Sequence, residues 1–258
     1  MSCVPLAVFM VMVMAVARGF QLRSARSVLT GAARGVSKQK LYAELIKPAD
    51  LFSKWAATGR DEVMADGHKP AVREMLAALA LEQNGAPFSF VDIGCGNGWV
   101  CRKQAKRAEC TETLGVDGAT NMIKKADMLK KAAGSTKCSF KQADLTTFTP
   151  DTAYDVALSM EVLYYLQPEE IPPFLKALSD RWVKPSGLFV MGVDHYYENT
   201  ESHGWAKLNN THMTLWREAQ WREEIERAGF EVLRQWRAAK REGMQEGTMA
   251  ILARNKAV

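Results

Sequence analysis

Several features are missing from this sequence, and each absence excludes a class of protein. None of the five cysteines forms a Cys-x-x-Cys pair, so the sequence predicts no metal site and no disulfide framework. The uncharged apolar run of residues 3–17 has only fifteen residues. A helix needs roughly 20 to span a bilayer, so this run is too short for a membrane anchor.

A basic surface is also missing once the N-terminal end is set aside. The formal net charge is +5, but residues 1–40 contain six positive residues and no acidic one, so the rest of the chain carries −1. Nucleic-acid-binding domains normally show a basic patch. We therefore expect no nucleic-acid partner.

The N-terminal end itself has the composition of a targeting leader. Residues 1–17 are typical of a signal peptide, with Ala15-Val16-Ala17 as an A-x-A cleavage site. Residues 18–40 are rich in Arg, Ser and Ala, as in an organellar transit peptide. Together they resemble the bipartite leaders of secondary plastids, which implies a plastid location; a mitochondrial presequence and a secretory signal are the alternatives. No stable membrane anchor is expected after the leader is removed.

The remaining chain alternates strand and helix patterns, which indicates a parallel sheet covered on both faces. Pro70 is expected at the first position of its helix, where a missing amide donor costs least. The predicted strands cover residues 89–93, 112–116, 139–143, 154–160, 188–193, 230–236 and 248–254. The predicted helices cover residues 70–82, 99–108, 119–133, 168–182 and 218–228. The last two strands have no room for a crossover helix between them, so they should be antiparallel.

The strongest local signal is the segment Val91-Asp92-Ile93-Gly94-Cys95-Gly96-Asn97-Gly98. It reads as a strand that enters a glycine turn and opens a helix. Glycines let the backbone turn tightly and let a ligand approach without a Cβ in the way. The spacing is G-x-G-x-G rather than the G-x-G-x-x-G of dinucleotide binding. A nicotinamide or flavin domain, or a purely structural loop, is the alternative to this motif taken alone.

Together with the segments that follow it, this motif resembles the class I S-adenosylmethionine-dependent methyltransferases of the small-molecule type. Asp117 and Asp144 end the second and third strands, residues 154–166 look like the family's fourth strand and turn, and residues 183–188 resemble its "L-K-P-G-G" turn. The resemblance implies an α/β fold with a doubly wound, seven-stranded, mostly parallel sheet and a C-terminal antiparallel hairpin. It also implies a helical cap over residues 41–84 and a catalytic domain over residues 85–258.

The resemblance further implies S-adenosylmethionine as the cofactor and assigns the residues that bind it. Asp117 would bind the ribose hydroxyls, Asp144 the adenine amino group, Arg60 the methionine carboxylate, and Trp55 would pack near the sulfonium. Read without the family, Asp117 is a helix N-cap, Asp144 caps a turn, Trp55 fills the core and Arg60 is a solvated charge. The complete predicted cofactor set is Trp55, Arg60, Asp92, Gly94, Gly96, Gly98, Asp117, Asp144 and Met160.

Residues after the fourth and fifth strands form the predicted acceptor side, because ligands of such sheets bind at the carboxyl ends of strands. His195 is the candidate general base, since the pKa of histidine lies near neutrality, and Tyr165 would orient the acceptor. The alternative for His195 is a loop histidine satisfied by backbone contacts. The predicted substrate-binding residues are Glu161, Tyr164, Tyr196 and Trp205.

We therefore expect an enzyme that transfers a methyl group to an N, O or S atom of a small molecule. An RNA or protein methyltransferase is the first alternative, but it would predict a basic patch or an added domain. The second alternative is a protein that binds S-adenosylmethionine without turnover.

Overall fold

A computed structural model describes residues 45–240 and 247–256 of the chain. The predicted leader lies outside these residues, so its targeting function and the domain boundaries that depend on it stay predictions. The described part contains a seven-stranded sheet of order β3-β2-β1-β4-β5-β7-β6. Its strands are β1 Phe88–Ile93, β2 Cys110–Asp117, β3 Cys138–Gln142, β4 Tyr154–Met160, β5 Val183–Val193, β6 Phe230–Ala238 and β7 Thr248–Asn255.

Strand direction follows the expected pattern. β3, β2, β1, β4 and β5 pair in parallel, whereas β7 pairs antiparallel with both β5 and β6. This confirms the mostly parallel sheet with an antiparallel C-terminal hairpin. All parallel strands therefore end at one edge of the sheet, where ligands of open α/β sheets bind.

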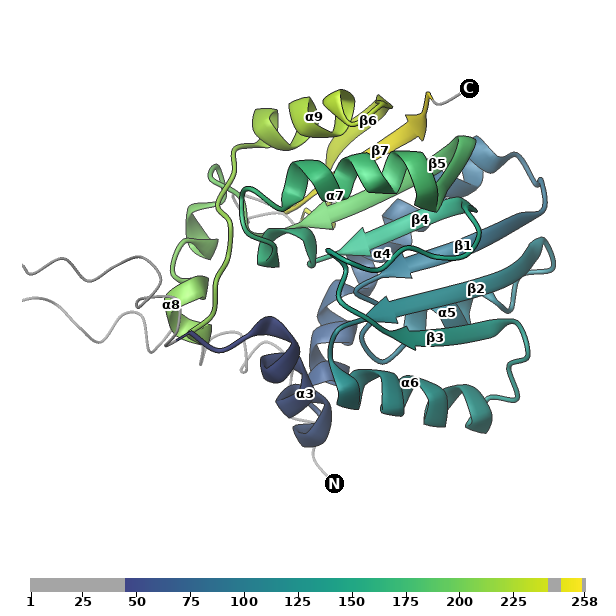
Figure 1. Cartoon of the computed structure of the whole chain (residues 1–258), viewed down its shortest axis with the longest axis horizontal. Coiled ribbons are helices and arrows are strands. Elements are labelled where there is room, and N and C mark those ends of the chain that lie inside the picture. Colours follow the sequence, from purple (N-terminus) through teal and green to yellow (C-terminus); the bar gives the residue numbers. More distant parts are fainter. Residues whose placement is uncertain (1–44, 241–246, 257–258) are drawn as a thin grey trace, which may run out of the picture. The chain divides into compact units, whose positions relative to one another are not determined.

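Helices cover both faces of this sheet (Figure 1). The α-helices are α3 Pro48–Thr58, α4 Arg60–Gln83, α5 Trp99–Gln104, α6 Thr120–Ala132, α7 Ile171–Ala177, α8 Trp205–Asn209 and α9 Glu218–Arg227. The short turns are η1 Leu163–Tyr165, η2 Leu178–Trp182 and η3 Thr200–Ser202. α4 and α5 lie on one face and α7 and α9 on the other, as the two largest hydrophobic clusters show.

The sequence of β1 explains how this strand packs against helices on both faces of the sheet. Phe88 and Phe90 pack in the cluster with α4, while Val91 and Ile93 pack in the cluster with α7 and α9. Successive side chains of a strand point to opposite faces, so a strand covered on both sides must be apolar almost throughout. All six residues of β1 are buried.

The prediction for Pro70 was wrong. α4 begins at Arg60, ten residues earlier, directly after Gly59, whose φ of 76° ends α3. Pro70 lies inside α4 and removes one hydrogen bond from the helix. Buried contacts of Val72, Met75 and Leu79 hold the helix together past this point, which local propensity could not reveal.

Other observed element boundaries differ from the predicted ones by a few residues. α5 ends at Gln104 rather than at residue 108, and the long helix expected over residues 168–182 is α7 followed by the π-helical turn η2. Pro172 and Pro173 do lie in the first turn of α7, as predicted. Among the residues that the structure describes, no helix is long and apolar enough to cross a membrane.

Candidate active site

A cavity of about 660 Å³ lies at the carboxyl ends of the parallel strands. Its walls come from α3, α4, the turn after β1 and the ends of β2, β3 and β4. Its size is in the range of small-molecule and cofactor sites. The predicted site residues that line it are Trp55, Asp92, Gly94, Gly96, Asp117, Asp144, Met160, Glu161, Tyr164 and Tyr165.

The glycine turn combines tight packing with an open face. A Cβ on Gly94 would lie 2.2 Å from Cγ2 of Val162, and one on Gly98 would lie 2.4 Å from the Phe140 ring. A Cβ on Gly96 would have its nearest neighbouring atom 4.0 Å away. Gly94 and Gly96 line the cavity. Gly98, which was also predicted as a cofactor residue, lies outside the lining, directly before the first residue of α5. Packing against Phe140 requires a glycine there.

Asp117 connects the end of β2 to this turn. Its Oδ2 accepts the N–H of Gly96 at 2.9 Å, and its Oδ1 accepts the N–H of Ala119 at 2.8 Å. Burial raises the pKa of Asp117, and these two donated hydrogen bonds oppose the increase. The carboxylate therefore shapes the glycine turn and the start of α6, and it also faces the cavity.

Asp92 is the most deeply placed carboxyl group of the site. It is 3% exposed, and its neighbour Cys101 lies with its thiol 3.8 Å from Oδ2. Burial, followed by the charge of Asp117, raises the pKa of Asp92 to about 7. The folded chain therefore holds a proton at Asp92 through a pH range in which the unfolded chain does not.

This shift predicts a pH-dependent stability. Between the unfolded pKa of 3.8 and the folded pKa of about 7, the folded state binds the additional proton, so the free energy of unfolding falls as pH rises. From pH 5 to pH 8 we expect Asp92 to cost about 2–3 kcal/mol of stability. Between pH 5 and pH 8, the free energy of unfolding measured in urea should fall by about 2–3 kcal/mol less for Asp92→Asn than for the wild type. Parallel pH curves for the two proteins would contradict the shift.

Asp144 and Met160 complete the strand-end side of the cavity. Oδ1 of Asp144 accepts hydrogen bonds from the backbone N–H of Thr146 at 2.9 Å and from its hydroxyl at 2.7 Å. The turn-capping alternative for Asp144 is thus present in the structure. The same residue lines the cavity, so capping and ligand binding are compatible.

The N-terminal helices form the opposite wall. Trp55 lies on α3 and lines the cavity. Arg60 is exposed and does not line it; its guanidinium stacks over the Trp55 ring at 4.1 Å from the ring centroid. This placement does not support Arg60 as the ligand of the methionine carboxylate. Lys47 is the one lysine or arginine side chain among the described residues that line the cavity.

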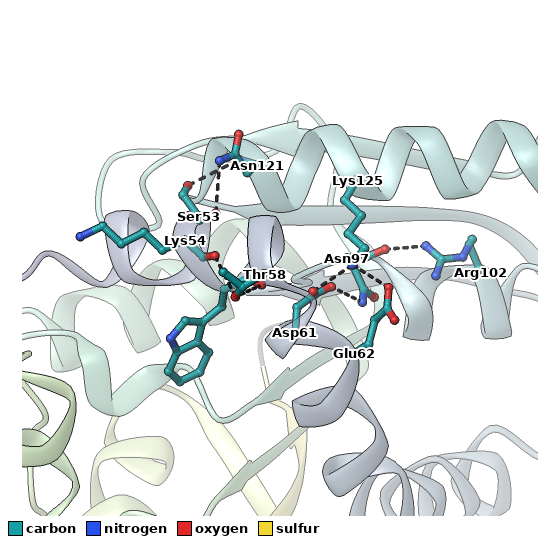
Figure 2. A network of polar contacts seen from close by, with 10 residues as sticks. Ser53, Lys54, Thr58, Asp61, Glu62, Asn97, Arg102, Asn121 and Lys125 are labelled. Carbon is teal, nitrogen blue, oxygen red and sulfur yellow. Dashed lines mark hydrogen bonds and ion pairs between the residues drawn. The ribbon is translucent and has the colours of Figure 1, made fainter. Parts of the chain in front are cut away.

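A polar network ties α4 to the glycine turn (Figure 2). Oδ2 of Asp61, on α4, accepts a hydrogen bond from the side chain of Asn97 at 2.8 Å, and Oδ1 forms an ion pair with Lys125 of α6 at 2.9 Å. Lys125 also contacts Glu62 at 2.7 Å, and Arg102 donates to the backbone oxygen of Asn97 at 2.5 Å. Asp61 is 4% exposed, so a partner lost here would leave a buried charge unpaired.

Sequence reasoning missed Asp61, because its partner Asn97 is 36 positions away and no local pattern links the two. A second contact of the same kind joins α3 to α6, where the side chain of Asn121 donates to the backbone oxygen of Ser53 at 3.2 Å. The N-terminal helices are thus fixed to the elements that carry the glycine turn.

Glu161 lies on the side of the cavity that was predicted to take the acceptor. This residue is 8% exposed and has a φ of 61°, which is uncommon for a residue other than glycine. One carboxylate oxygen accepts a hydrogen bond from the Tyr164 hydroxyl at 2.8 Å, and the other accepts one from the backbone N–H of Asp194. Burial, followed by the charge of Asp194, raises the pKa of Glu161. The ring centroids of Tyr164 and Tyr165 lie 4.5 Å apart beside it.

His195, Tyr196 and Trp205, which were predicted for catalysis and substrate binding, lie outside the cavity lining. The His195 ring is 1% exposed, its Nδ1 lies 3.2 Å from the Ser202 carbonyl, and Trp205 stacks on it at a centroid distance of 6.3 Å. Tyr196 is fully buried, and its hydroxyl donates to the Gly247 carbonyl at 3.0 Å. Nδ1 of His195 thus has a backbone partner, as in the loop-histidine alternative, whereas its buried Nε2 has no hydrogen-bond partner among the described residues.

The histidine that does line the cavity is His68, on α4. Burial lowers its pKa, and the charge of Asp194 partly opposes this decrease, so the imidazole is neutral at pH 7. His68 lies within the predicted cap of residues 41–84, and no sequence pattern favoured it over His195. The difference is decided by how α4 crosses the strand ends.

The cysteines of the described residues form no disulfide, and Cys95 lines the cavity. Cys95, Cys101, Cys110 and Cys138 are buried, free thiols. Within residues 45–240 and 247–256, no group of three or more His, Cys, Asp or Glu side chains is arranged to hold a metal ion.

Comparison with known proteins gives a consistent result. The methyltransferase domain family matches residues 64–235. A malonyl-[acyl-carrier protein] O-methyltransferase of Halalkalibacterium halodurans is 29% identical over 124 residues, which is 45% of this chain. The match spans 44% of that relative's length, less than half of it.

Solved structures match over more of the chain. The methyltransferase in a complex with the Trm112 methyltransferase activator of Haloferax volcanii has a TM-score of 0.70 and 26% identity, covering 80% of this chain and 98% of its own. Magnesium protoporphyrin IX methyltransferase of Synechocystis PCC 6803 with bound S-adenosylhomocysteine has a TM-score of 0.59 and 18% identity, covering 73% and 84%. The chain thus belongs to the methyltransferase domain family.

Proposed function

We propose that the chain transfers the methyl group of S-adenosylmethionine to a small molecule bound in the cavity of about 660 Å³. The observation that supports this most directly is the continuity of the cavity. The glycine turn and Asp117 line one part of it, and an aromatic and carboxylate wall lines the other. Relatives such as the malonyl-[acyl-carrier protein] O-methyltransferase fit this reaction class but do not fix the acceptor.

The residues present fit the cofactor. The open side of Gly96 leaves room for a ligand against the backbone, and each carboxylate oxygen of Asp117 accepts one hydrogen bond and can accept another. We assign Asp117 to the ribose hydroxyls and Asp144 to the adenine amino group. Trp55 is assigned to the wall near the sulfonium, where an aromatic face attracts positive charge.

When bound, S-adenosylmethionine supplies an activated methyl group, so the protein needs mainly to position the acceptor in line with it and to exclude water. α3 and α4 provide the cover, and the ion pair of Asp61 with Lys125 fixes the start of α4. Tyr164 and Tyr165 lie where they would orient an acceptor. These side chains supply orientation, and an acceptor that carries a proton additionally needs a base.

Calorimetry tests the cofactor part of this proposal. The full-length chain is titrated with S-adenosylhomocysteine, and NAD serves as the control ligand. We expect a micromolar dissociation constant, or about −8 kcal/mol, for the first and no heat of binding for the second. A folded protein that binds neither would refute the cofactor assignments. Binding without turnover of any acceptor would favour a protein that only binds S-adenosylmethionine.

The Haloferax volcanii complex suggests a second point. The methyltransferase in it was solved with an activator protein, and it is 26% identical to this chain. We propose that this chain also binds a Trm112-type partner. Size-exclusion chromatography of the chain co-expressed with a Trm112 protein of the same source should show one complex, and separate elution of the two proteins would refute it.

A further inference from the structure

We propose that the acceptor is a small amine, held by Glu161 and relieved of its proton by His68. This inference rests on the proposed function, because it names the substrate class for the same cavity. It separates nitrogen acceptors from the oxygen acceptors that the methyltransferase family also allows. Three sets of contacts carry it, and they come from different elements.

The first is the charge of the cavity wall. Lys47 is the one cation among the described side chains that line it, apart from the titratable His68, and no arginine does. Carboxyl groups line it repeatedly, and Glu161 and Glu170 do so away from the glycine turn. A carboxylate acceptor would have to enter against these charges, whereas recognition of a carboxylate normally uses arginine. The wall therefore favours a cationic ligand.

The second is the way Glu161 is held. The Tyr164 hydroxyl and the backbone N–H of Asp194 fix the two oxygens of its carboxyl group, and its backbone keeps a left-handed φ of 61°. Such a conformation persists where surrounding contacts determine it. Burial raises the pKa of Glu161, so an ammonium group beside it would compensate a charge that the cavity otherwise disfavours.

The third set of contacts comes from aromatic side chains and a histidine in the cavity wall. Tyr165 contacts Phe52 edge to face at 5.2 Å, and Phe52 contacts Trp55 at 5.0 Å, so aromatic side chains continue across the cavity. Aromatic faces attract ammonium and alkylammonium groups. His68 lines the same cavity with a neutral imidazole, and Asp194, whose charge reaches it, has a buried Oδ1 without a hydrogen-bond partner in the described part of the chain.

The chemistry follows from these positions. An arriving ammonium gives one proton to His68, which frees the nitrogen lone pair. The lone pair attacks the methyl carbon, the N–C bond forms, and the C–S bond breaks with its electron pair passing to sulfur. The nitrogen becomes positive as this happens, and Glu161, which lines the cavity, stabilises that charge. The imidazolium of His68 returns its proton to water. A hydroxyl acceptor would instead build negative charge beside the same carboxyl groups.

The test uses the full-length chain, S-adenosylmethionine and three acceptor pools that share the same arylalkyl skeletons: primary amines, phenols and carboxylic acids. Formation of S-adenosylhomocysteine is measured. We expect turnover with the amine pool. With the best amine of that pool, Glu161→Gln should lower kcat/KM at least about 30-fold, since it removes a charged partner. His68→Asn should lower kcat about 100-fold with little change in KM, as expected for a proton acceptor.

Matched controls separate the outcomes. Glu169→Gln makes the same substitution at an exposed residue outside the cavity lining and should keep kcat/KM within twofold. Calorimetry with S-adenosylhomocysteine shows whether each variant still binds the cofactor product. A wild type that binds no S-adenosylhomocysteine refutes the proposed function. A wild type that binds it but uses the phenol or acid pool, or makes no product from the amine pool, refutes the amine assignment alone.

Discussion

Replacing Asp117 by alanine is expected to weaken binding of S-adenosylhomocysteine about 100-fold, which corresponds to about 2.7 kcal/mol. The carboxylate faces the cavity and is assigned to two ribose hydroxyls, and a hydrogen bond to a charged group contributes about 1.5–3 kcal/mol. The substitution also leaves the N–H groups of Gly96 and Ala119 without their acceptor, so the glycine turn loses its support. Calorimetry on the folded variant measures the effect.

Two companion variants make the Asp117 result interpretable. Asp117→Asn keeps one carbonyl oxygen but replaces the other acceptor by an NH2 group, so its affinity should lie between those of the wild type and Asp117→Ala. Asp151→Ala removes an exposed carboxylate outside the cavity lining and should leave affinity unchanged. A folded Asp117→Ala protein with wild-type affinity would remove the ribose assignment.

Replacing Gly94 by alanine is expected to lower the free energy of unfolding by about 2–5 kcal/mol. The new Cβ would lie 2.2 Å from Cγ2 of Val162, which a packed core cannot accept without movement, and overpacking costs about 1–3 kcal/mol. The φ of 71° adds about 1–2 kcal/mol for any residue with a Cβ. Urea unfolding at one pH gives the loss directly.

Gly85 provides the matched control for Gly94. Its φ is 76°, but a Cβ built on it has no atom within 4 Å. Gly85→Ala should therefore cost only the conformational part, about 1–2 kcal/mol. Adding Val162→Ala to Gly94→Ala should recover part of the difference, because it removes the methyl groups that the Cβ overlaps. Equal losses for Gly94→Ala and Gly85→Ala would show that the turn is not tightly packed.

The sequence predicted the sheet better than the helices beside it. β4, Tyr154–Met160, begins and ends at the predicted residues, because a buried strand bounded by polar turns is a short-range pattern. α4 was predicted to start at Pro70 and starts at Arg60. Proline normally marks a helix start, and only tertiary packing explains a helix that continues through it.

The part of the cavity around the glycine turn was largely predictable, and the part around Glu161 and His68 was not. Asp92, Gly94 and Asp117 belong to strand ends and their turns, whose place in a parallel sheet follows from chain order. His195 also follows a strand end, yet the backbone after β5 turns its ring into the core. His68, from a helix that crosses the strand ends, lines the cavity in its place.

The sequence by itself thus determined the fold class, the directions of the strands, and the glycine turn with its carboxylates. These depend on apolar periodicity and turn chemistry, which act between residues close along the chain. Only the tertiary structure decided that Arg60 stacks on Trp55, that Asp61 joins Asn97 and Lys125, and which histidine lines the cavity. Those outcomes depend on packing between residues far apart in the chain, where several side-chain arrangements satisfy the same local pattern.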